Sequence, residues 1–187
     1  MSNMTKRALS MSLKRMLNQR KLDDITIQDL VDDAEVSRKT FYYHFQDVYS
    51  LLEWIFLDEG KRLLQGNTTA DTWQQGLGSV FDYFQENRTM IMNVYRSLQK
   101  DDRILKAHIS QLISPTLQRI FDAQPNHELV DAEDRQFILK LYSFGLVELF
   151  LHWIDDGMKP DAEQLMGQID RVFSGSMDYL IRQCLEK

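Results

Sequence analysis

The hydrophobic residues of this 187-residue chain recur mostly at spacings of three and four positions, which is the pattern of amphipathic helices. Leu9, Leu13 and Leu17 show it near the N-terminus, where the lysines and arginines lie off the apolar stripe. No segment alternates apolar and polar residues over the length of a strand. The pattern therefore predicts an all-α protein.

Polar breaks between the apolar segments divide the chain into about nine expected helices. Only 8 glycines and 3 prolines interrupt the sequence, so we expect long helices and few tight turns. Pro115 falls inside one helical segment and is expected to kink or interrupt it. The expected helices cover residues 5–20, 27–34, 37–44, 47–65, 72–86, 88–99, 102–123, 132–156 and 161–184.

The segment GNTTAD, residues 66–71, is the clearest linker in the chain. We expect a small N-terminal domain over residues 1–48, which the helix at about 47–65 connects to a larger domain over residues 66–187. A chain of this length can bury one substantial core and a smaller second one.

Charge is distributed unevenly between these two parts. The net charge of the chain is -6, yet residues 1–50 carry eight Lys or Arg against seven Asp or Glu. The remaining residues carry 14 cations against 21 carboxylates. The N-terminal quarter is therefore the part that tolerates a polyanion, while the acidic remainder repels one.

The composition excludes several classes of protein. A 43% hydrophobic and 27% charged chain is typical of a soluble globular protein. Cys184 is the single cysteine, which rules out an intrachain disulfide and a multi-cysteine zinc site and fits a reducing compartment. No apolar run reaches the ~18 residues of a membrane span, and charges interrupt the N-terminal segment before it resembles a signal peptide. We expect a cytoplasmic protein without a membrane partner, metal or cofactor.

The stretch AEVSRKTFYYHF, residues 34–45, carries the most informative motif. Thr26, with Asp29 three residues later, is expected to cap a short helix, and Ser37 is expected to cap the next one. Two short helices joined by a three-residue turn are the arrangement of a helix-turn-helix. The spacing predicts that Phe41 points into the core.

The opposite side of the second helix presents two cations and two phenols. At 100° per residue they share an arc of about 140°, and this chemistry suits DNA, since cations reach phosphates or guanine and phenols donate to phosphates. The alternative is that the tyrosines are half-buried and the cations are merely solvated. The four residues are Arg38, Lys39, Tyr42 and Tyr43.

Residues 25–55 resemble the DNA-binding domain of the tetracycline-repressor (TetR) family, and the resemblance extends over residues 5–60. A branch of that family containing dihydroxyacetone-kinase operon regulators is also similar. The matching positions are Ile25, Thr26, Ala34, Val36, Ser37, Thr40, Phe41, Tyr42, His44, Phe45, Leu51 and Leu52.

The resemblance implies a role for each contact residue. Arg38, Lys39 and Tyr43 would contact base edges, while other residues of the N-terminal domain would contact phosphates. These are Lys6, Thr26, Tyr42 and His44, with Ser37 and Thr40 of the matched motif also counted among the DNA-binding residues.

Two positions depart from the pattern of the family. Glu35 stands where the family has a turn glycine, and a left-handed Glu costs roughly 1 kcal/mol relative to Gly. Val48 stands where a lysine often opens the fourth helix, which removes one phosphate contact. Both changes predict a weaker hold on DNA and a shallow dependence of binding on salt.

The family resemblance also implies that the C-terminal domain binds a small-molecule effector and forms a homodimer through its last two long helices, at about 132–156 and 161–184. Apolar residues surround most of the first of these helices, as expected for a helix buried against a partner or in an intramolecular core. Candidate pocket residues, each of which also suits a plain core position, are Trp73, Phe81, Phe84, Met92, Tyr95, His108, Phe144, Glu148 and His152.

The sequence thus favours a sequence-specific transcriptional regulator, expected to be a ligand-responsive repressor that binds a palindromic operator in double-stranded DNA as a homodimer. The alternative is a weakly DNA-binding coactivator or protein-interaction module of the same fold. An enzyme is not expected, because the chain has no zinc-helix motif, glycine-rich phosphate loop or nucleophile elbow.

Overall fold

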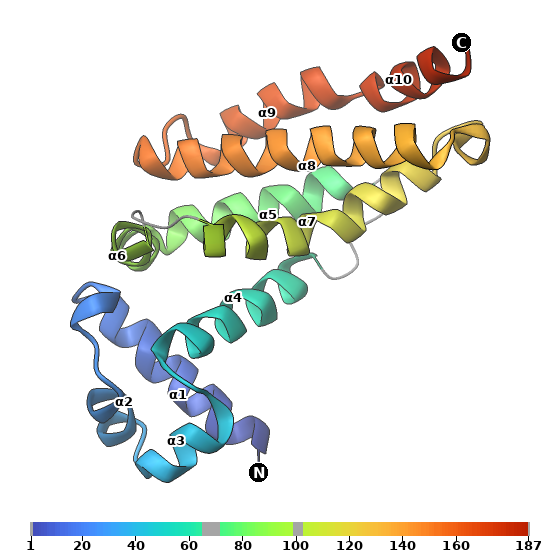
Figure 1. The fold of residues 1–187 in the computed structure, drawn as a ribbon. Helices are drawn as coiled ribbons and strands as arrows, with labels where there is room; N and C mark the ends of the chain where they lie inside the picture. Colours follow the sequence, from blue (N-terminus) through green and yellow to red (C-terminus); the bar gives the residue numbers. More distant parts are fainter. Residues whose placement is uncertain (1, 65–71, 99–102, 187) are drawn as a thin grey trace. The chain divides into compact units, whose positions relative to one another are not determined.

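A computed structural model describes residues 2–64, 72–98 and 103–186 of the chain, and this part is helical without strands, which confirms the all-α fold class. The predicted linker at residues 66–71 lies outside the described residues. The described helices are α1 (Ser2–Leu17), η1 (Leu22–Asp24), α2 (Ile27–Asp33), α3 (Arg38–His44), α4 (Val48–Leu64), α5 (Trp73–Glu86), α6 (Arg88–Leu98), α7 (Arg103–Asp122), η2 (His127–Leu129), α8 (Ala132–Asp155), α9 (Ala162–Phe173) and α10 (Ser176–Leu185) (Figure 1).

The helices form two compact units. The first comprises residues 1–59 and 87–105, and the second comprises residues 60–86 and 106–187. The sequence assigned α6 to the C-terminal domain, whereas its packing places it in the first unit, against α1 and η1. The side-chain amide of Asn93 donates to the backbone oxygen of Leu17 at 2.8 Å.

Polar caps set the limits of the short helices in the first unit. Thr26 and Asp29 form the predicted capping box, in which each side chain accepts a hydrogen bond from the other residue's backbone N–H. The carboxylate of Asp29 accepts from the backbone N–H of Thr26 and also from its hydroxyl, and these two bonds, the backbone one first, hold the pKa of Asp29 below its usual value. Ser37 caps α3 by accepting from the backbone N–H of Thr40 at 3.0 Å. The predicted caps are therefore confirmed.

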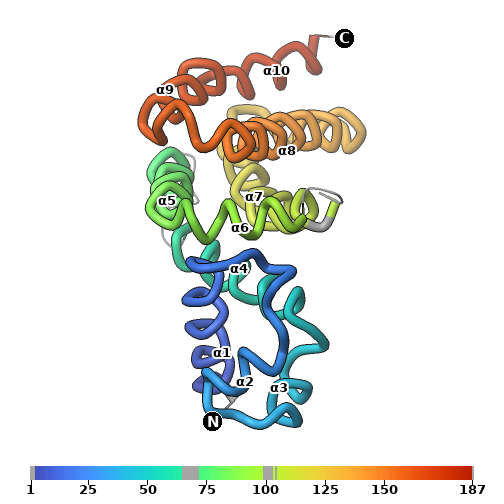
Figure 2. The backbone as a smooth tube through the Cα atoms, turned by 90° about the vertical axis from the view of Figure 1, so that its left-hand side faces the viewer, coloured from blue at the N-terminus to red at the C-terminus, as the bar shows by residue number. Residues whose placement is uncertain are grey.

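The core of the first unit gathers apolar residues from α1, α2, α3 and α4, whose paths are traced in Figure 2. Leu13 from α1, Leu30 from α2 and Phe41 from α3 expose none of their surface. Removing this much apolar surface from water supplies the main driving force for packing three short helices that would be marginal alone.

Buried polar groups connect α1 to α2 and to α4. The Ser12 hydroxyl, almost fully buried, donates to the carboxylate of Asp33, which also pairs with Arg15. The hydrogen bond from Ser12, followed by the bond and charge of Arg15, holds the pKa of Asp33 below its usual value. On another face of α1, Lys14 pairs with the buried carboxylate of Glu59 on α4.

In the second unit, α5 packs directly against α9, and α8 runs beside them and contacts α9's successor α10 (Figures 1 and 2). Edge-to-face contacts join α5 to α8: the ring centroid of Phe81 lies 5.1 Å from that of Phe150 and 4.9 Å from that of Trp153. The indole N–H of Trp153 donates to the backbone oxygen of Pro160 at 2.7 Å, so this buried donor is satisfied.

Two predictions concerned helix continuity, and the expected continuous C-terminal helix was wrong. The single helix expected over 161–184 is broken into α9 and α10, and Gly175 between them has a φ of 73°, a left-handed conformation that glycine adopts without a steric penalty. Conversely, α7 continues through Pro115 without interruption. A proline removes only one helix hydrogen bond, and the turns on both sides of it remain helical.

The α8 helix is long and apolar enough to cross a membrane by length and composition. Half of its most apolar window is buried inside the protein, as in the core helix of a soluble protein. We therefore treat α8 as a packing helix.

Replacing Asp33 by Ala is expected to lower the free energy of unfolding by about 1–2 kcal/mol near neutral pH, because the buried Ser12 hydroxyl loses its acceptor. The folded pKa of Asp33 is lowered, so its stabilising effect is present above the unfolded value of about 3.9 and is lost as pH falls through the folded pKa. The difference between the two proteins should therefore shrink in acid.

Denaturant unfolding at neutral pH and at about pH 3 measures this difference. The exposed Asp58, replaced by Ala, serves as the control and should change stability little. An Asp33 effect that is equally large in acid would contradict the assignment.

Candidate DNA-binding and ligand sites

The outer face of α3 carries the predicted DNA-binding side chains. Tyr43 is 82% exposed and Tyr42 is 54% exposed, while Phe41, which precedes them in the sequence, is fully buried. Arg38 and Lys39, at the start of α3, are also exposed. The structure thus brings together two cations and two phenols on one accessible surface, and the prediction that Phe41 points inward is confirmed.

The turn before α3 has the strained geometry that the sequence predicted. Glu35 has a φ of 53°, so a non-glycine residue occupies the left-handed region. Two backbone bonds enclose it: the N–H of Ala34 donates to Leu30 O and the N–H of Val36 donates to Val31 O, both at 2.9 Å. The Glu35 side chain is exposed beside the start of α3.

The remaining predicted contact residues support this surface in different ways. The ammonium of Lys6 lies 5.7 Å from the ring centroids of both Phe45 and Trp54, so it makes cation–π contacts with the residue that ends α3 and with a residue of α4. The imidazole of His44 is half-buried, with its centroid 4.9 Å from that of Tyr43. Thr26 is exposed at the start of α2.

The structure places Val48, the second departure from the family pattern, at the start of α4 and buries it. The backbone N–H of Ser50 donates to the carboxylate of Asp47 at 2.7 Å, so Asp47 caps the start of this helix.

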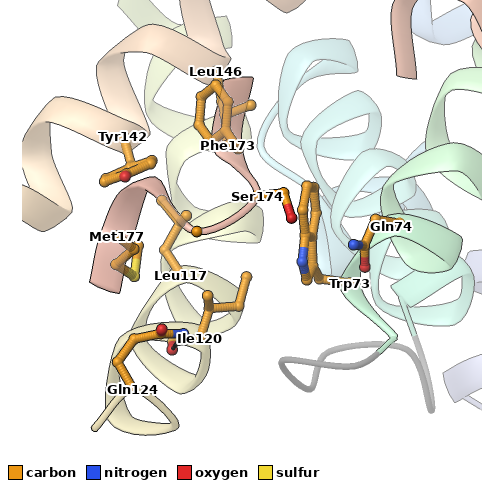
Figure 3. A pocket seen from close by; sticks show the side chains of 11 residues that line it. Trp73, Gln74, Leu117, Ile120, Gln124, Tyr142, Leu146, Phe173, Ser174 and Met177 are labelled. Carbon is orange, nitrogen blue, oxygen red and sulfur yellow. Dashed lines mark hydrogen bonds between the residues drawn. The ribbon is translucent and has the colours of Figure 1, made fainter. Parts of the chain in front are cut away.

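The second unit contains a wide pocket of about 550 Å³ between α5 and α9, and two smaller cavities of different character. One, of about 160 Å³, lies between α5, α7, α8 and the break between α9 and α10. Figure 3 shows Trp73 and Gln74 on one side of it, facing side chains of α7 and α10 on the other. Its lining mixes aromatic and polar groups: Trp73, Gln74, Leu117, Ile120, Gln124, Tyr142, Leu146, Phe173, Ser174, Gly175 and Met177.

The second cavity, of about 60 Å³, is apolar throughout. It lies among α4, α5, α7 and α8 and is lined by Leu64, Leu77, Val80, Phe81, Phe84, Ile109, Leu112, Ile113, Leu146 and Phe150. We call the first the mixed cavity and the second the apolar cavity.

Three of the predicted pocket residues line these cavities: Trp73 the mixed one, and Phe81 and Phe84 the apolar one. Met92 and Tyr95 instead lie on α6, within the first unit. Their apolar spacing gave no indication of which unit the helix would join.

The other four predicted pocket residues line neither cavity. His108 is half-buried on α7. Phe144 is 64% exposed on α8, and one turn further on Glu148 pairs with Lys106 at 2.7 Å. The exposed His152 lies 3.4 Å from Asp156. Because α8 is apolar on nearly all sides, its sequence did not reveal which side faces the interior.

Several lining residues were missed by sequence reasoning, although a signal for them exists. Ile109, Ile113, Leu117 and Ile120 recur at spacings of three and four along α7, which marks one face of the helix as inward. Nothing in that spacing separates a cavity wall from a filled core, so Phe173 and its neighbours at the helix break could not be identified either.

The exposed side of α8 forms a continuous apolar stripe, which we call the α8 face. Phe137, Leu141 and Phe144 are 66%, 52% and 64% exposed, respectively. They are spaced by four and three residues and therefore share one side of the helix. Large apolar residues are also exposed on α9 and α10, at Val172 and Tyr179.

Among the described residues, no group of three or more His, Cys, Asp or Glu side chains is arranged to hold a metal ion.

Comparison with known proteins identifies the family. A model of the TetR C-terminal type, described as "Transcriptional regulator C-terminal region", matches residues 71–175. This match covers more than half of the chain and adds to the helix-turn-helix of the first unit. The chain belongs to the TetR family of transcriptional regulators.

The individual relatives share low sequence identity with this chain. The HTH-type dhaKLM operon transcriptional activator DhaS of Lactococcus lactis subsp. lactis (strain IL1403) is 27% identical over 94 residues, so the match spans about half the length of this curated relative. A solved structure of the dihydroxyacetone kinase operon activator DhaS has 20% identity and a TM-score of 0.68, with 96% of each chain covered. A TetR transcriptional regulator from Streptococcus agalactiae 2603V has 20% identity and a TM-score of 0.59, with 98% of this chain and 94% of that chain covered. These likenesses show a shared fold.

Replacing Glu35 by Gly is expected to raise the free energy of unfolding by about 0.5–1 kcal/mol, because the left-handed penalty exceeds the entropy that glycine adds to the unfolded chain. Replacing it by Gln keeps the strained backbone and removes only the charge, so stability should stay unchanged. Denaturant unfolding of both variants separates strain from charge. Equal stabilisation by Gly and Gln would contradict the strain argument.

Proposed function

We propose that this TetR-family protein is a sequence-specific DNA-binding regulator that acts as a homodimer and responds to a small-molecule effector. The observation that carries the proposal is the outer face of α3, where Arg38, Lys39, Tyr42 and Tyr43 are exposed together. A helix that presents cations and phenols beside each other suits the major groove, where cations reach guanine and phenols reach phosphates.

The proposed dimer places the α8 face against the same face of a second copy. Exposed aromatic and aliphatic residues in a row are unusual on a monomer, and isologous contact would remove them from water. Gly145 lies beside Phe144, and a Cβ added there would meet nothing within 4 Å, so the backbone is accessible to a partner. The break at Gly175 and the exposed Val172 and Tyr179 favour a contribution from α9 and α10.

The proposed effector occupies the cavities of the second unit, where Trp73, Phe81 and Phe84 are the predicted pocket residues that form walls. Regulators of this family are generally non-enzymatic, soluble and typically cytoplasmic, and we propose the same for this protein. As the sequence predicts, we propose repression as its effect on transcription.

Activation is the second candidate, because the curated relative is named a transcriptional activator. In this form the protein holds DNA weakly and acts through a partner, which Glu35 and the acidic surface favour. Transcription from a reporter fused to the gene's own upstream region, with and without the protein, distinguishes a fall in output from a rise.

Replacing Lys39 or Tyr43 by Ala is expected to weaken binding to the gene's own upstream DNA by about ten- to a hundredfold, the size of one lost base contact. Electrophoretic mobility shift at low salt measures it, with the exposed Lys61 replaced by Ala as a matched control. The logarithm of the binding constant should fall shallowly with the logarithm of salt, because few phosphates are contacted. Absence of specific binding by the unaltered protein would refute DNA recognition.

Replacing Phe144 by Asp is expected to convert the dimer into a monomer, since a carboxylate in a desolvated interface has no partner. Sedimentation velocity measures the mass, and circular dichroism checks that the fold is kept. Leu129, equally exposed on η2, replaced by Asp is the control and should leave the dimer intact. A dimer that survives the Phe144 change would place the interface elsewhere.

A further inference from the structure

The wide pocket between α5 and α9 meets the mixed cavity at the side chain of Gln74, which lines both spaces. On α9, Asp170 lines the wide pocket, and Phe173, about one turn further on, lines the mixed cavity. The side-chain amide of Gln74 donates to the carboxylate of Asp170 at 3.1 Å. This hydrogen bond therefore lies at the junction between a polar lining and an aromatic one.

Oxygen acceptors remain available at this junction. The bond uses an N–H of Gln74, so the amide oxygen of Gln74 and the second carboxylate oxygen of Asp170 are left as acceptors. The hydroxyl of Ser174 lies beside the indole of Trp73 in the mixed cavity (Figure 3). An ammonium carries three N–H donors and no acceptor, whereas a carboxylate carries acceptors only. The junction therefore suits a cationic donor rather than an anion.

Negative charge surrounds these acceptors. The lining of the wide pocket includes the carboxylates of Asp82, Glu163 and Asp170. Among the described residues that line the two spaces, none is Lys, Arg or His. One cation lies close by, because the guanidinium of Arg171 is 3.8 Å from the position that a Cβ at Gly167 would take. It offsets one of the three carboxylates, so a cation that enters the pocket is attracted and an anion is repelled.

The mixed cavity has the size and walls for one aromatic ring. An apolar cavity of about 150 Å³ accepts benzene, and the mixed cavity has a volume of about 160 Å³. Figure 3 shows the indole of Trp73 on one side of it and the rings of Tyr142 and Phe173 on the other. Aromatic walls pack favourably against an aromatic ring, and their faces also attract a nearby cation.

We infer that the second unit binds an arylalkylamine, with its aromatic ring in the mixed cavity beside Trp73 and its primary ammonium at Gln74 and Asp170. This inference rests on the proposed effector site and names the chemical class of the effector. A rise of about 4.5 Å along α9 separates Asp170 from Phe173, and a linker of about two carbons between ring and nitrogen spans it.

The test titrates the full chain with 2-phenylethylamine in the absence of DNA, and isothermal titration calorimetry measures binding. Three analogues each change one property: 2-phenylethanol is neutral, 3-phenylpropanoate is an anion, and ethylamine lacks the ring. The neutral analogue should bind at least about tenfold more weakly, because a hydrogen bond to a charged group is replaced by an uncharged one. The anion should bind more weakly still, and ethylamine should lose at least about tenfold with the buried ring.

Two variants locate the ligand. Asp170→Asn keeps the shape and an acceptor for Gln74 but removes the charge, so 2-phenylethylamine should bind about tenfold more weakly while 2-phenylethanol is unaffected. A purely structural role of Asp170 would change both affinities alike. Trp73→Leu removes an aromatic wall and should weaken both ligands about three- to tenfold.

Glu133→Gln, which neutralises an exposed carboxylate on α8 outside both linings, is the matched control and should leave both affinities unchanged. Thermal unfolding checks that each variant is folded.

Absence of saturable binding of 2-phenylethylamine, equal affinity for 2-phenylethanol, or unchanged amine affinity in Asp170→Asn would each overturn the inference. The mobility shift tests the proposed regulatory function separately. Amine binding by a protein that does not bind DNA would uphold the ligand class and refute the regulator, and DNA binding without amine binding would do the opposite.

Discussion

The burial of Phe41 is the constraint on which the proposed DNA-binding surface of α3 depends. An α-helix of seven residues has little stability of its own, so its rotation about its axis is set by the side chain it buries. With Phe41 fully enclosed, Arg38, Lys39 and Tyr42 are left exposed, and the phenol of Tyr43 lies in solvent. The same side chain therefore stabilises the helix and determines which residues can meet a partner.

The strained backbone of the turn before α3 is held in place by the hydrogen bonds around it. Glu35 occupies a left-handed conformation, which a Cβ disfavours. The cap at Ser37 and the backbone bond from Val36 to Val31 fix both ends of the turn, so the chain cannot relax without losing them. The carboxylate then remains near the cations of α3, where it weakens attraction to any polyanion.

Much of the first unit could be predicted from the sequence, because local chemistry determines it. Thr26 and Ser37 are caps whose partners lie three residues away, and the spacing around Phe41 gives the orientation of α3 without knowledge of the tertiary fold. The position of α6 could not be predicted in the same way. Its contact through Asn93 to Leu17 joins segments far apart in the chain, which no local pattern reveals.

The limits of sequence reasoning are clearest on α8. A helix that is apolar on nearly every side does not indicate which side is covered by its own chain. Trp153 and Phe150 contact Phe81 in the interior, whereas Phe137 and Phe144, equally hydrophobic, are exposed. The same ambiguity hid the break at Gly175, because one glycine in an amphipathic segment is compatible with a continuous helix.

The excess negative charge of the chain lies outside the two cavities of the second unit. Residues 51–187 carry 21 carboxylates against 14 cations, yet neither cavity is lined by any of them. The excess charge is therefore presented outside the two cavities, where it repels a polyanion and confines attraction to the cations of α3. The linings of both cavities are free of charged side chains, so apolar area and shape dominate the surface that they present.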